Sequence, residues 1–423
     1  MKNITITLYE DRKTLIDINE KQQRDIMELR KLWEPQNFIY QVDSSILLKH
    51  YVGFVANKQV KLQILPKIFE ENSGMDSLDK KDEAIKILLR LLYYSGYIKT
   101  KEIPSPQNIK NYKSDLFEIF ISIFIKRFFK LFFRDVHRKY EKAISNTQFI
   151  KGKILFSETL RKNSYYKHLH YVQYDEFTMN TILNKIIKTT MIYLLSQSLS
   201  MENKKELKKA LIYLEDVDRI RLSEIAFKKV TFNRLNHDYQ PLFNMAKMFY
   251  YNLKPGFYEG DQKTFTFLVP LYNLFEKFVY QLLHKHYINN SQKEVLYQKP
   301  EHYLAVKDDS KKFKLKPDIT IRENNKVKVI LDAKYKNPNK KILPSDVYQM
   351  LAYATAYKCK ELYLVYPAFH KMKSPVEIRD TFIINTDFDD ICLHVVQIDL
   401  RENNIESVQN ELGSIISDDN NIL

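Results

Sequence analysis

Two acidic residues and a lysine in the C-terminal part of the chain have the types and spacing of a hydrolytic site. Asp318 follows a proline and leads into a β-branched run, and the sequence Asp332-Ala333-Lys334 ends an apolar stretch fourteen residues later. Residues two apart in a strand share a face, so the side chains of Asp332 and Lys334 point the same way. We expect an antiparallel hairpin that turns near residues 323–326 to bring Asp318 beside them.

Two carboxylates beside a lysine suit metal-dependent hydrolysis of a phosphodiester. Mg²⁺ prefers hard oxygen ligands, and it can lower the pKa of a bound water and stabilise charge that develops on phosphorus. A nearby ammonium can position the attacking water. The structural alternative is a Pro-Asp turn and a surface pair of Asp332 and Lys334. The spacing acid-x-Lys alone decides nothing, because it recurs in polar segments such as Asp79 to Lys81.

Two predicted helices add side chains to this group. Glu276 lies in an apolar helix over 271–287, and a buried acid needs a partner or a metal. Gln349 and Tyr353 lie four apart on a helix that runs from a Ser345 N-cap to Tyr357, so they share one face. The alternatives are an acid that interacts with the helix dipole and an ordinary polar helix face.

The elements around these residues predict an α/β domain over 262–423, which begins with the order α-β-β-β-α-β. The tail from Arg401 is polar and is expected to fray. The strands of this domain are predicted over 295–298, 313–322, 327–335, 362–366, 382–385 and 394–400.

The upstream sequence predicts two further regions, so the fold class is a multidomain α+β protein. Residues 1–75 form a β-rich N-terminal domain, and 76–261 form a mainly helical middle region after a polar loop at 71–82. The N-terminal strands are predicted over 4–8, 47–56 and 60–65 around a helix at 19–33, and the helices of the middle region over 115–140, 180–196 and 204–214.

The helix predicted over 115–140 has an apolar face and a separate basic stripe. The stripe repeats every four residues and consists of Lys126, Lys130, Arg134 and Arg138. It is either a surface that follows a nucleic-acid backbone or a solvated helix face.

Composition excludes several classes of protein. The 67 Lys and Arg against 52 Asp and Glu give a net charge of +15. This surplus favours nucleic acid as partner ahead of an anionic membrane surface. A Lys-rich proteome would give the same surplus. The seven glycines form neither a P-loop nor a GxGxxG motif, which excludes the usual nucleotide-binding folds. Cys359 and Cys392 form no CxxC motif, so neither a disulfide framework nor a cysteine zinc site is expected. We expect a cytoplasmic protein without a membrane segment.

The site residues together resemble the PD-(D/E)xK nuclease superfamily, in the branch with a QxxxY helix, and the chain from about residue 45 to 370 is similar to the McrC family of McrBC modification-dependent restriction systems. The upstream matches are Tyr51-Val52-Gly53-Phe54, Ile64-Leu65-Pro66-Lys67-Ile68, Leu91-Leu92-Tyr93-Tyr94-Ser95-Gly96, Phe149-Ile150-Lys151-Gly152-Lys153-Ile154, Tyr174-Asp175-Glu176-Phe177-Thr178 with Asn184, and Arg234-Leu235-Asn236 with Tyr239.

The resemblance implies a role for each site residue. Asp318 and Asp332 would ligate Mg²⁺, with the Ala333 carbonyl as a third ligand, and Glu276 would help to hold the metal or orient its water. Lys334 would position the nucleophilic water. Gln349 and Tyr353 would support the site or touch the DNA backbone.

The resemblance also implies partners. The chain would cut DNA as a phage-defence endonuclease and would activate an McrB-like AAA+ GTPase, whose ring its N-terminal part would dock and whose own chain would bind the GTP. Two alternatives remain open at this stage. One is a repair or recombination nuclease with another motor, and the other is a regulatory subunit with a vestigial nuclease domain.

Overall fold

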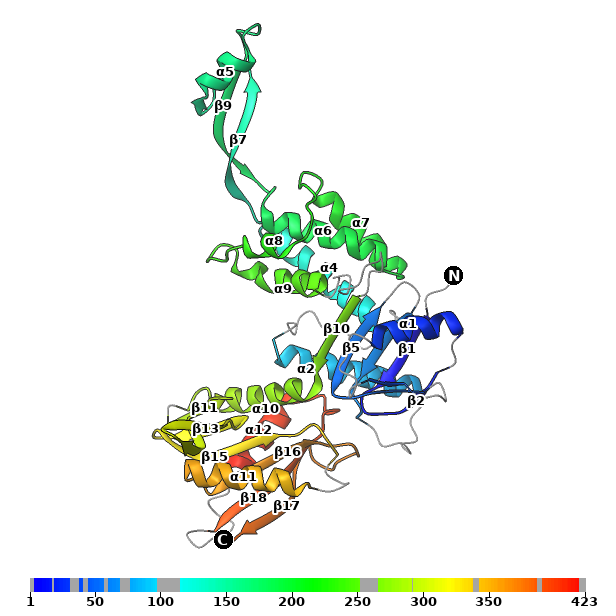
Figure 1. Ribbon diagram of the computed structural model, residues 1–423, viewed down its shortest axis with the longest axis vertical. Helices are drawn as coiled ribbons and strands as arrows, with labels where there is room; N and C mark the ends of the chain where they lie inside the picture. Colours follow the sequence, from blue (N-terminus) through cyan, green and yellow to red (C-terminus); the bar gives the residue numbers. More distant parts are fainter. Residues whose placement is uncertain are drawn as a thin grey trace. The chain divides into compact units, whose positions relative to one another are not determined.

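The chain folds into two compact units in the computed structural model (Figure 1). One unit comprises Met1–Leu116 with Pro255–Leu423, and the other comprises Phe117–Lys254. Within the described residues, no helix combines the length and the apolarity that crossing a membrane requires. The structure describes residues 4–16, 19–30, 38–40, 45–56, 60–68, 77–96, 115–251, 265–290, 292–337, 342–385 and 390–417.

The N-terminal part of the first unit is β-rich, as the sequence predicts. A four-stranded sheet has the order β1-β6-β5-β10, and a three-stranded sheet has the order β2-β4-β3. The strands are β1 (Ile4–Tyr9), β2 (Thr14–Leu15), β3 (Phe38–Tyr40), β4 (Ser45–Leu48), β5 (Tyr51–Ala56), β6 (Val60–Leu65) and β10 (Phe265–Pro270). Helix α1 (Glu20–Arg30) lies inside the predicted helical range, and the strand predicted over 47–56 is divided at His50, which has a φ of 69°.

Strand β10 joins the beginning and the end of the first unit. It pairs antiparallel with β5, where Leu268 lies opposite Gly53. Gly53 has a φ of 133°, and a Cβ there would lie 1.9 Å from the Phe267 carbonyl oxygen, so only glycine allows this strand pairing. The chain then passes directly from β10 into the first helix of the C-terminal domain.

The C-terminal domain is built on a six-stranded mixed sheet of order β11-β14-β15-β16-β18-β17. The strands are β11 (Lys293–Tyr297), β14 (Ile319–Glu323), β15 (Lys326–Ala333), β16 (Glu361–Pro367), β17 (Val376–Ile384) and β18 (Ile391–Ile398), with a separate hairpin of β12 (His302–Lys307) and β13 (Ser310–Leu315). The strand predicted over 313–322 is therefore two strands, which separate around Pro317.

Helices cover the two faces of this sheet. Helix α11 (Pro344–Tyr357) packs on the face that carries Ile330, Leu362 and Leu393. Side chains alternate along strands, so the residues between these point to the opposite face. Helices α10 (Leu271–Tyr287) and α12 (Ile405–Ser417) pack against each other, where the Tyr287 hydroxyl contacts the Gly413 carbonyl and the Ser417 hydroxyl.

Three further predictions for this unit need correction. The tail after Arg401 does not fray through Ser417, the last residue described, because α12 buries Val408, Leu412 and Ile416 along one face. Ser345 is not the N-cap of α11, since Leu343 takes that place and Pro344 begins the helix. The loop predicted at 71–82 is also too long, because α2 (Ser77–Tyr94) begins inside it; residues 71–76 lie outside the described part of the chain.

The second unit combines a helical core with a β arm that extends away from the helices (Figure 1). The helices are α4 (Leu116–Arg134), α6 (Ile182–Gln197), α7 (Met201–Tyr213), α8 (Glu224–Lys228) and α9 (Gln240–Tyr251), with a short 3-10 helix η2 (His237–Tyr239). The arm consists of β7 (Lys139–Thr147), β8 (Lys153–Ile154), β9 (His170–Thr178) and α5 (Phe156–Lys162).

The arm corrects the prediction of a continuous helix over 115–140. Helix α4 ends at Arg134, and the antiparallel pairing of β7 with β9 begins at Lys139. Strand β7 has no buried residue, so its sequence lacks the apolar alternation that marks a strand with one core face. Glycine is needed at Gly152, where φ is 66° and a Cβ would lie 2.3 Å from the Gln173 carbonyl oxygen. The three-domain division at 75/76 and 261/262 stays a prediction, and both boundaries lie outside the described residues.

Candidate active site

The hairpin predicted from the sequence brings Asp318 beside the end of β15. Strands β14 and β15 pair antiparallel with Ile319 opposite Leu331. The turn consists of Asn324 and Asn325, with φ values of 50° and 62°, as a tight hairpin turn requires. Asp318 Oδ2 accepts a hydrogen bond of 2.9 Å from the backbone N–H of Ala333. This bond fixes Asp318, just before β14, to Ala333 at the end of β15.

Asp332 and Lys334 meet where β15 ends. Asp332 is 1% exposed, and its Oδ2 lies 2.5 Å from Lys334 Nζ. The charge of Asp332 and its hydrogen bond with the ammonium both act to raise the pKa of Lys334. The backbone N–H of Lys334 donates to the Val365 carbonyl at 2.8 Å, which holds Lys334 at the end of the parallel strand pair.

A chain of hydrogen bonds from α11 orients the lysine. Lys334 Nζ donates to Gln349 Oε1 at 3.2 Å, and Gln349 Nε2 donates to the Tyr353 hydroxyl at 2.8 Å. The Tyr353 hydroxyl donates in turn to the Lys316 carbonyl at 3.0 Å, just before Asp318. The structure thus brings Gln349 and Tyr353 into the cluster, and their shared helix face points at the lysine rather than at solvent.

Glu276 reaches the same cluster from α10. It is 7% exposed, and its Oε2 accepts a hydrogen bond of 2.8 Å from Gln298 Nε2. The backbone N–H of Gln298 also donates to the Asp318 carbonyl at 2.8 Å. Sequence reasoning missed Gln298, although its place directly after a strand, before Lys299 and Pro300, was a signal of a turn that could hold a functional side chain.

The electrostatics of the cluster are those of acids crowded together away from water. Burial, with the charges of Asp332 and Glu276, raises the pKa of Asp318 to about 8. Burial and Asp332 also raise the pKa of Glu276. For Lys334, burial alone would lower the pKa, but Asp332 raises it above the ordinary value. One lysine therefore faces several carboxyl groups that repel one another when ionised.

This arrangement suits a hard cation. The donor atoms are carboxylate oxygens of Asp318, Asp332 and Glu276, which is the ligand type that Mg²⁺ prefers. Asp332 brings a buried carboxylate oxygen to this site, with the Lys334 ammonium beside it. Ala333 ends β15 beside these groups, so its carbonyl is available to the same site.

The residues of the predicted basic stripe lie in the second unit, and not all of them lie on helix α4. Lys126 and Lys130 are exposed on α4, whereas Arg134 forms an ion pair with Asp238. Arg138 lies beyond the end of α4, with its guanidinium 5.9 Å from the centre of the Phe177 ring. The four cations therefore do not form one continuous helical face.

Several of the upstream motif residues have structural roles in the second unit. Asn184 Nδ2 donates to the His137 carbonyl at 2.8 Å, and the His137 backbone N–H donates to the Tyr239 hydroxyl at 3.2 Å. The Tyr239 hydroxyl donates to the Asp135 carbonyl at 2.9 Å. These buried hydrogen bonds hold the segment between α4 and β7, where the helix gives way to the arm.

Comparison with known proteins gives a consistent result. One similar chain comes from a solved half-complex of a tetradecameric assembly of Thermococcus gammatolerans McrB AAA+ hexamers with bound McrC. That chain is 22% identical, with a TM-score of 0.70. The match covers 97% of this chain and all of that one. A chain of the Thermococcus gammatolerans McrBC complex is 25% identical with a TM-score of 0.52, over 67% of this chain and 88% of that one. No curated protein matches the sequence.

The family comparison covers most of the chain. Residues 46–367 match the family described as McrBC 5-methylcytosine restriction system component. The matched range includes the N-terminal sheet from β5, the whole second unit and every residue of the carboxylate cluster. The chain belongs to the McrBC 5-methylcytosine restriction system component family.

Proposed function

We propose that this chain is the Mg²⁺-dependent endonuclease subunit of a GTP-driven restriction complex that cuts modified DNA. The observation that carries the proposal is the joining of Asp318, Asp332 and Lys334 in one cluster, with Gln349 bonded to the lysine. Family membership supports the proposal, because the family is that of a restriction system for 5-methylcytosine.

Each residue of the cluster has its own proposed role in the reaction. Asp318, Asp332, Glu276 and the Ala333 carbonyl would hold Mg²⁺, which when bound supplies a Lewis acid for the phosphate and for water. Lys334 holds its ammonium where it can position a nucleophilic water and stabilise charge on phosphorus. Gln349 limits the freedom of that ammonium, and Tyr353 limits the freedom of Gln349.

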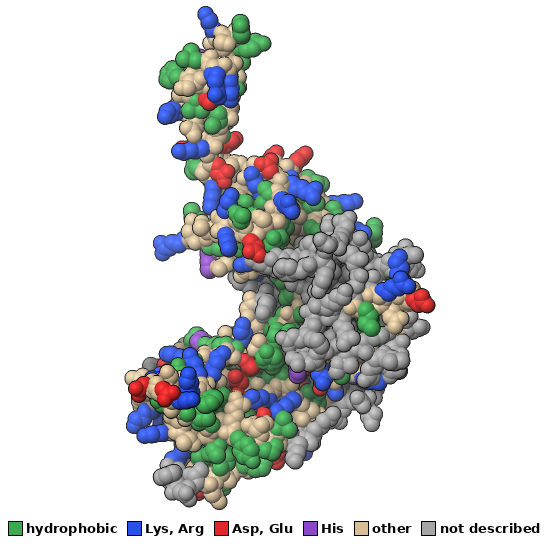
Figure 2. Space-filling model, in the orientation of Figure 1, with side chains coloured by type: hydrophobic (Ala, Val, Ile, Leu, Met, Phe, Trp, Pro, Cys, Tyr) green, Lys and Arg blue, Asp and Glu red, His purple; other side chains and the backbone are tan. Residues whose placement is uncertain are grey.

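The proposed partner is an AAA+ GTPase of McrB type. The solved relatives are chains in assemblies with McrB, and in the Thermococcus gammatolerans half-complex the McrB forms AAA+ hexamers. The arm of the second unit offers a surface for such contacts, since it exposes apolar side chains beside basic ones (Figure 2). Its exposed large apolar residues are Tyr140, Ile144, Phe149, Ile150, Phe156, Leu160, Tyr165, Tyr166 and Phe177. The N-terminal sheet remains the other proposed docking region.

The test is cleavage of 5-methylcytosine-containing DNA with Mg²⁺ by wild type and by Asp332→Asn, each with and without the AAA+ subunit and GTP. We expect only the wild type to cut, and only with partner and GTP. The variant should still stimulate GTP hydrolysis, because Asp332 serves the DNA site alone.

Two outcomes would contradict the proposal. Full cleavage by Asp332→Asn would remove the carboxylate cluster from the chemistry. Stimulated GTP hydrolysis without cleavage by the wild type would favour a regulatory subunit with a vestigial nuclease domain.

A further inference from the structure

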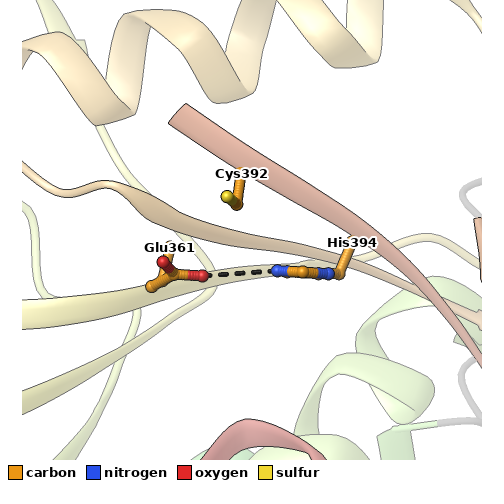
Figure 3. Close-up of side chains that lie close together, drawn as sticks. All are labelled: Glu361, Cys392 and His394. Carbon is orange, nitrogen blue, oxygen red and sulfur yellow. Dashed lines mark hydrogen bonds and ion pairs between the residues drawn. The ribbon is translucent and has the colours of Figure 1, made fainter. Parts of the chain in front are cut away.

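A second group of ligand-type side chains lies in the C-terminal domain, away from the carboxylate cluster. Glu361 begins β16, and Cys392 and His394 lie two apart on β18 (Figure 3). One ligand atom from each of the three lies within 4.8 Å of the others. The group combines a carboxylate, a thiol and an imidazole, which is a different donor set from the oxygen-only cluster.

Strand pairing fixes these three residues on one face of the sheet. In the parallel pair of β16 and β18, Glu361 lies opposite Cys392 and Tyr363 lies opposite His394. The intervening residues Leu362 and Leu393 belong to the core under α11. The three side chains therefore project to the face opposite α11, whereas Lys334 bonds to Gln349 of α11 on the other face.

His394 is held in an orientation that suits a ligand. Its ring stacks on Tyr363 with centroids 4.9 Å apart, and its Nδ1 lies 3.0 Å from the hydroxyl of Thr381 on the neighbouring strand β17. Its Nε2 therefore points to Glu361 Oε2 at 3.3 Å. A histidine that binds a metal through one nitrogen commonly uses the other nitrogen for such a fixing contact.

A cavity reaches the group at Glu361. A cavity of about 120 Å³ is lined by Glu361 together with Lys328 of β15, Tyr287 of α10 and Ile416 of α12. A cavity of this size holds several waters. Glu361 is 32% exposed and His394 only 9% exposed, so the group has one open side and one closed side.

We propose that Glu361, Cys392 and His394 form a binding site for a divalent transition-metal ion of the Zn²⁺ type, with a water on the Glu361 side as fourth ligand. Thiolate, imidazole and carboxylate are the three protein ligands that Zn²⁺ accepts. The thiol of Cys392 loses its proton to solvent when the metal binds. The bound ion ties β16 to β18, and its softer donors separate it from the Mg²⁺ cluster.

The test is a titration of the full-length chain with Co²⁺ in excess Mg²⁺, followed by optical absorption. Thiolate ligation of Co²⁺ gives a sulfur-to-metal charge-transfer band, which the carboxylate cluster cannot produce because it has no sulfur. We expect one equivalent of Co²⁺ to give the band, one equivalent of Zn²⁺ to abolish it, and Cys392→Ser to lack it.

Matched variants show which side chains hold the metal. Cys359→Ser is the control, because Cys359 is the other cysteine and its Sγ donates to the Lys328 carbonyl at 3.1 Å. This variant should keep the band. Glu361→Gln and Thr381→Val should weaken Zn²⁺ binding by about 10-fold to 100-fold, the first as a lost ligand and the second as a lost partner of His394.

Thermal unfolding supplies a readout that does not depend on colour. Zn²⁺ should raise the Tm of wild type and of Cys359→Ser but leave that of Cys392→Ser unchanged. Absence of the charge-transfer band in wild type, or its persistence in Cys392→Ser, would overturn the proposal.

Discussion

In a folded protein, charged side chains usually lie at the surface and large apolar side chains lie inside. The carboxylate cluster and the β arm both depart from this rule, each with a different kind of side chain. The cluster removes charge from water, since Asp332 is 1% exposed and Glu276 is 7% exposed. The arm leaves apolar rings in water, since Tyr165 is 94% exposed and Phe149 is 79% exposed. Stability of the isolated chain explains neither arrangement.

The two regions differ in what would complete them. A buried group of carboxylates is relieved by a cation, and an exposed apolar surface is relieved by another protein. Substitutions in the cluster should therefore change chemistry and leave assembly intact. Substitutions in the arm should change assembly and leave the chemistry of the cluster intact.

The largest effect is expected at Lys334. Lys334→Met should lower the rate of DNA cleavage by about 10²-fold to 10³-fold, the range lost when one preorganised electrostatic group is removed. Single-turnover cleavage by the assembled complex measures it. Lys326→Met, an exposed lysine on the same strand, is the matched control and should cleave as wild type does. Equal rates for the two variants would place the chemistry elsewhere.

A smaller effect is expected one hydrogen bond away from the lysine. Gln349→Leu removes the acceptor of the 3.2 Å bond from Lys334 and should lower the cleavage rate by about 10-fold to 100-fold. Tyr353→Phe should cost less, because it leaves the bond between Lys334 and Gln349 in place. A larger loss in Tyr353→Phe than in Gln349→Leu would contradict this order of support.

The parts of the cluster that are local in sequence could be predicted, and the reason is geometric. Alternation along one strand places Asp332 with Lys334, and one hairpin adds Asp318. Helical periodicity places Gln349 with Tyr353, although which way their face points required the structure. The sequence marks Gln298 only as a residue near a turn, because its contact with Glu276 depends on the meeting of α10 with the end of β11.

Features that depend on pairing between strands distant in sequence, or on an unusual environment, were not predicted from the sequence. The group of Glu361, Cys392 and His394 exists only because β16 lies beside β18. The strands of the arm lack an apolar alternation because little of the arm is buried. Helix α12 has apolar residues at helical spacing, Val408, Leu412 and Ile416, but the polar residues around them led to the prediction of a frayed tail. Its packing against α10 also depends on Gly413, where a Cβ would come within 2.3 Å of the His286 ring.

The arm gives the next effect in size, and it should appear in assembly alone. Phe149→Ser with Tyr165→Ser should weaken binding to the AAA+ subunit by about 10-fold or more, since exposed aromatic side chains often dominate interfaces. The Tm should change little, because surface substitutions usually alter stability by less than about 0.5 kcal/mol. Analytical ultracentrifugation with the partner measures the first quantity, and unchanged affinity would remove the arm from the interface.

The smallest effect is a pH dependence of stability that comes from Asp318. Its pKa is raised from an ordinary value of 3.8 to about 8 in the folded chain, first by burial and then by Asp332 and Glu276. Between these values the folded state binds more protons than the unfolded state, so the free energy of unfolding falls as pH rises from about 4 to about 8.

Asp318→Asn removes that titration. In chelator above pH 8, the variant should unfold at a Tm higher than that of wild type by about 2–4 °C, which corresponds to roughly 1 kcal/mol in a domain of this size. The difference should shrink near pH 5, where Asp318 is protonated in the folded wild type. Mg²⁺ should raise the Tm of wild type at high pH and raise that of the variant less. A wild-type Tm that does not depend on pH or Mg²⁺ would mean that repulsion among the carboxylates of the cluster does not lower the stability of the folded chain.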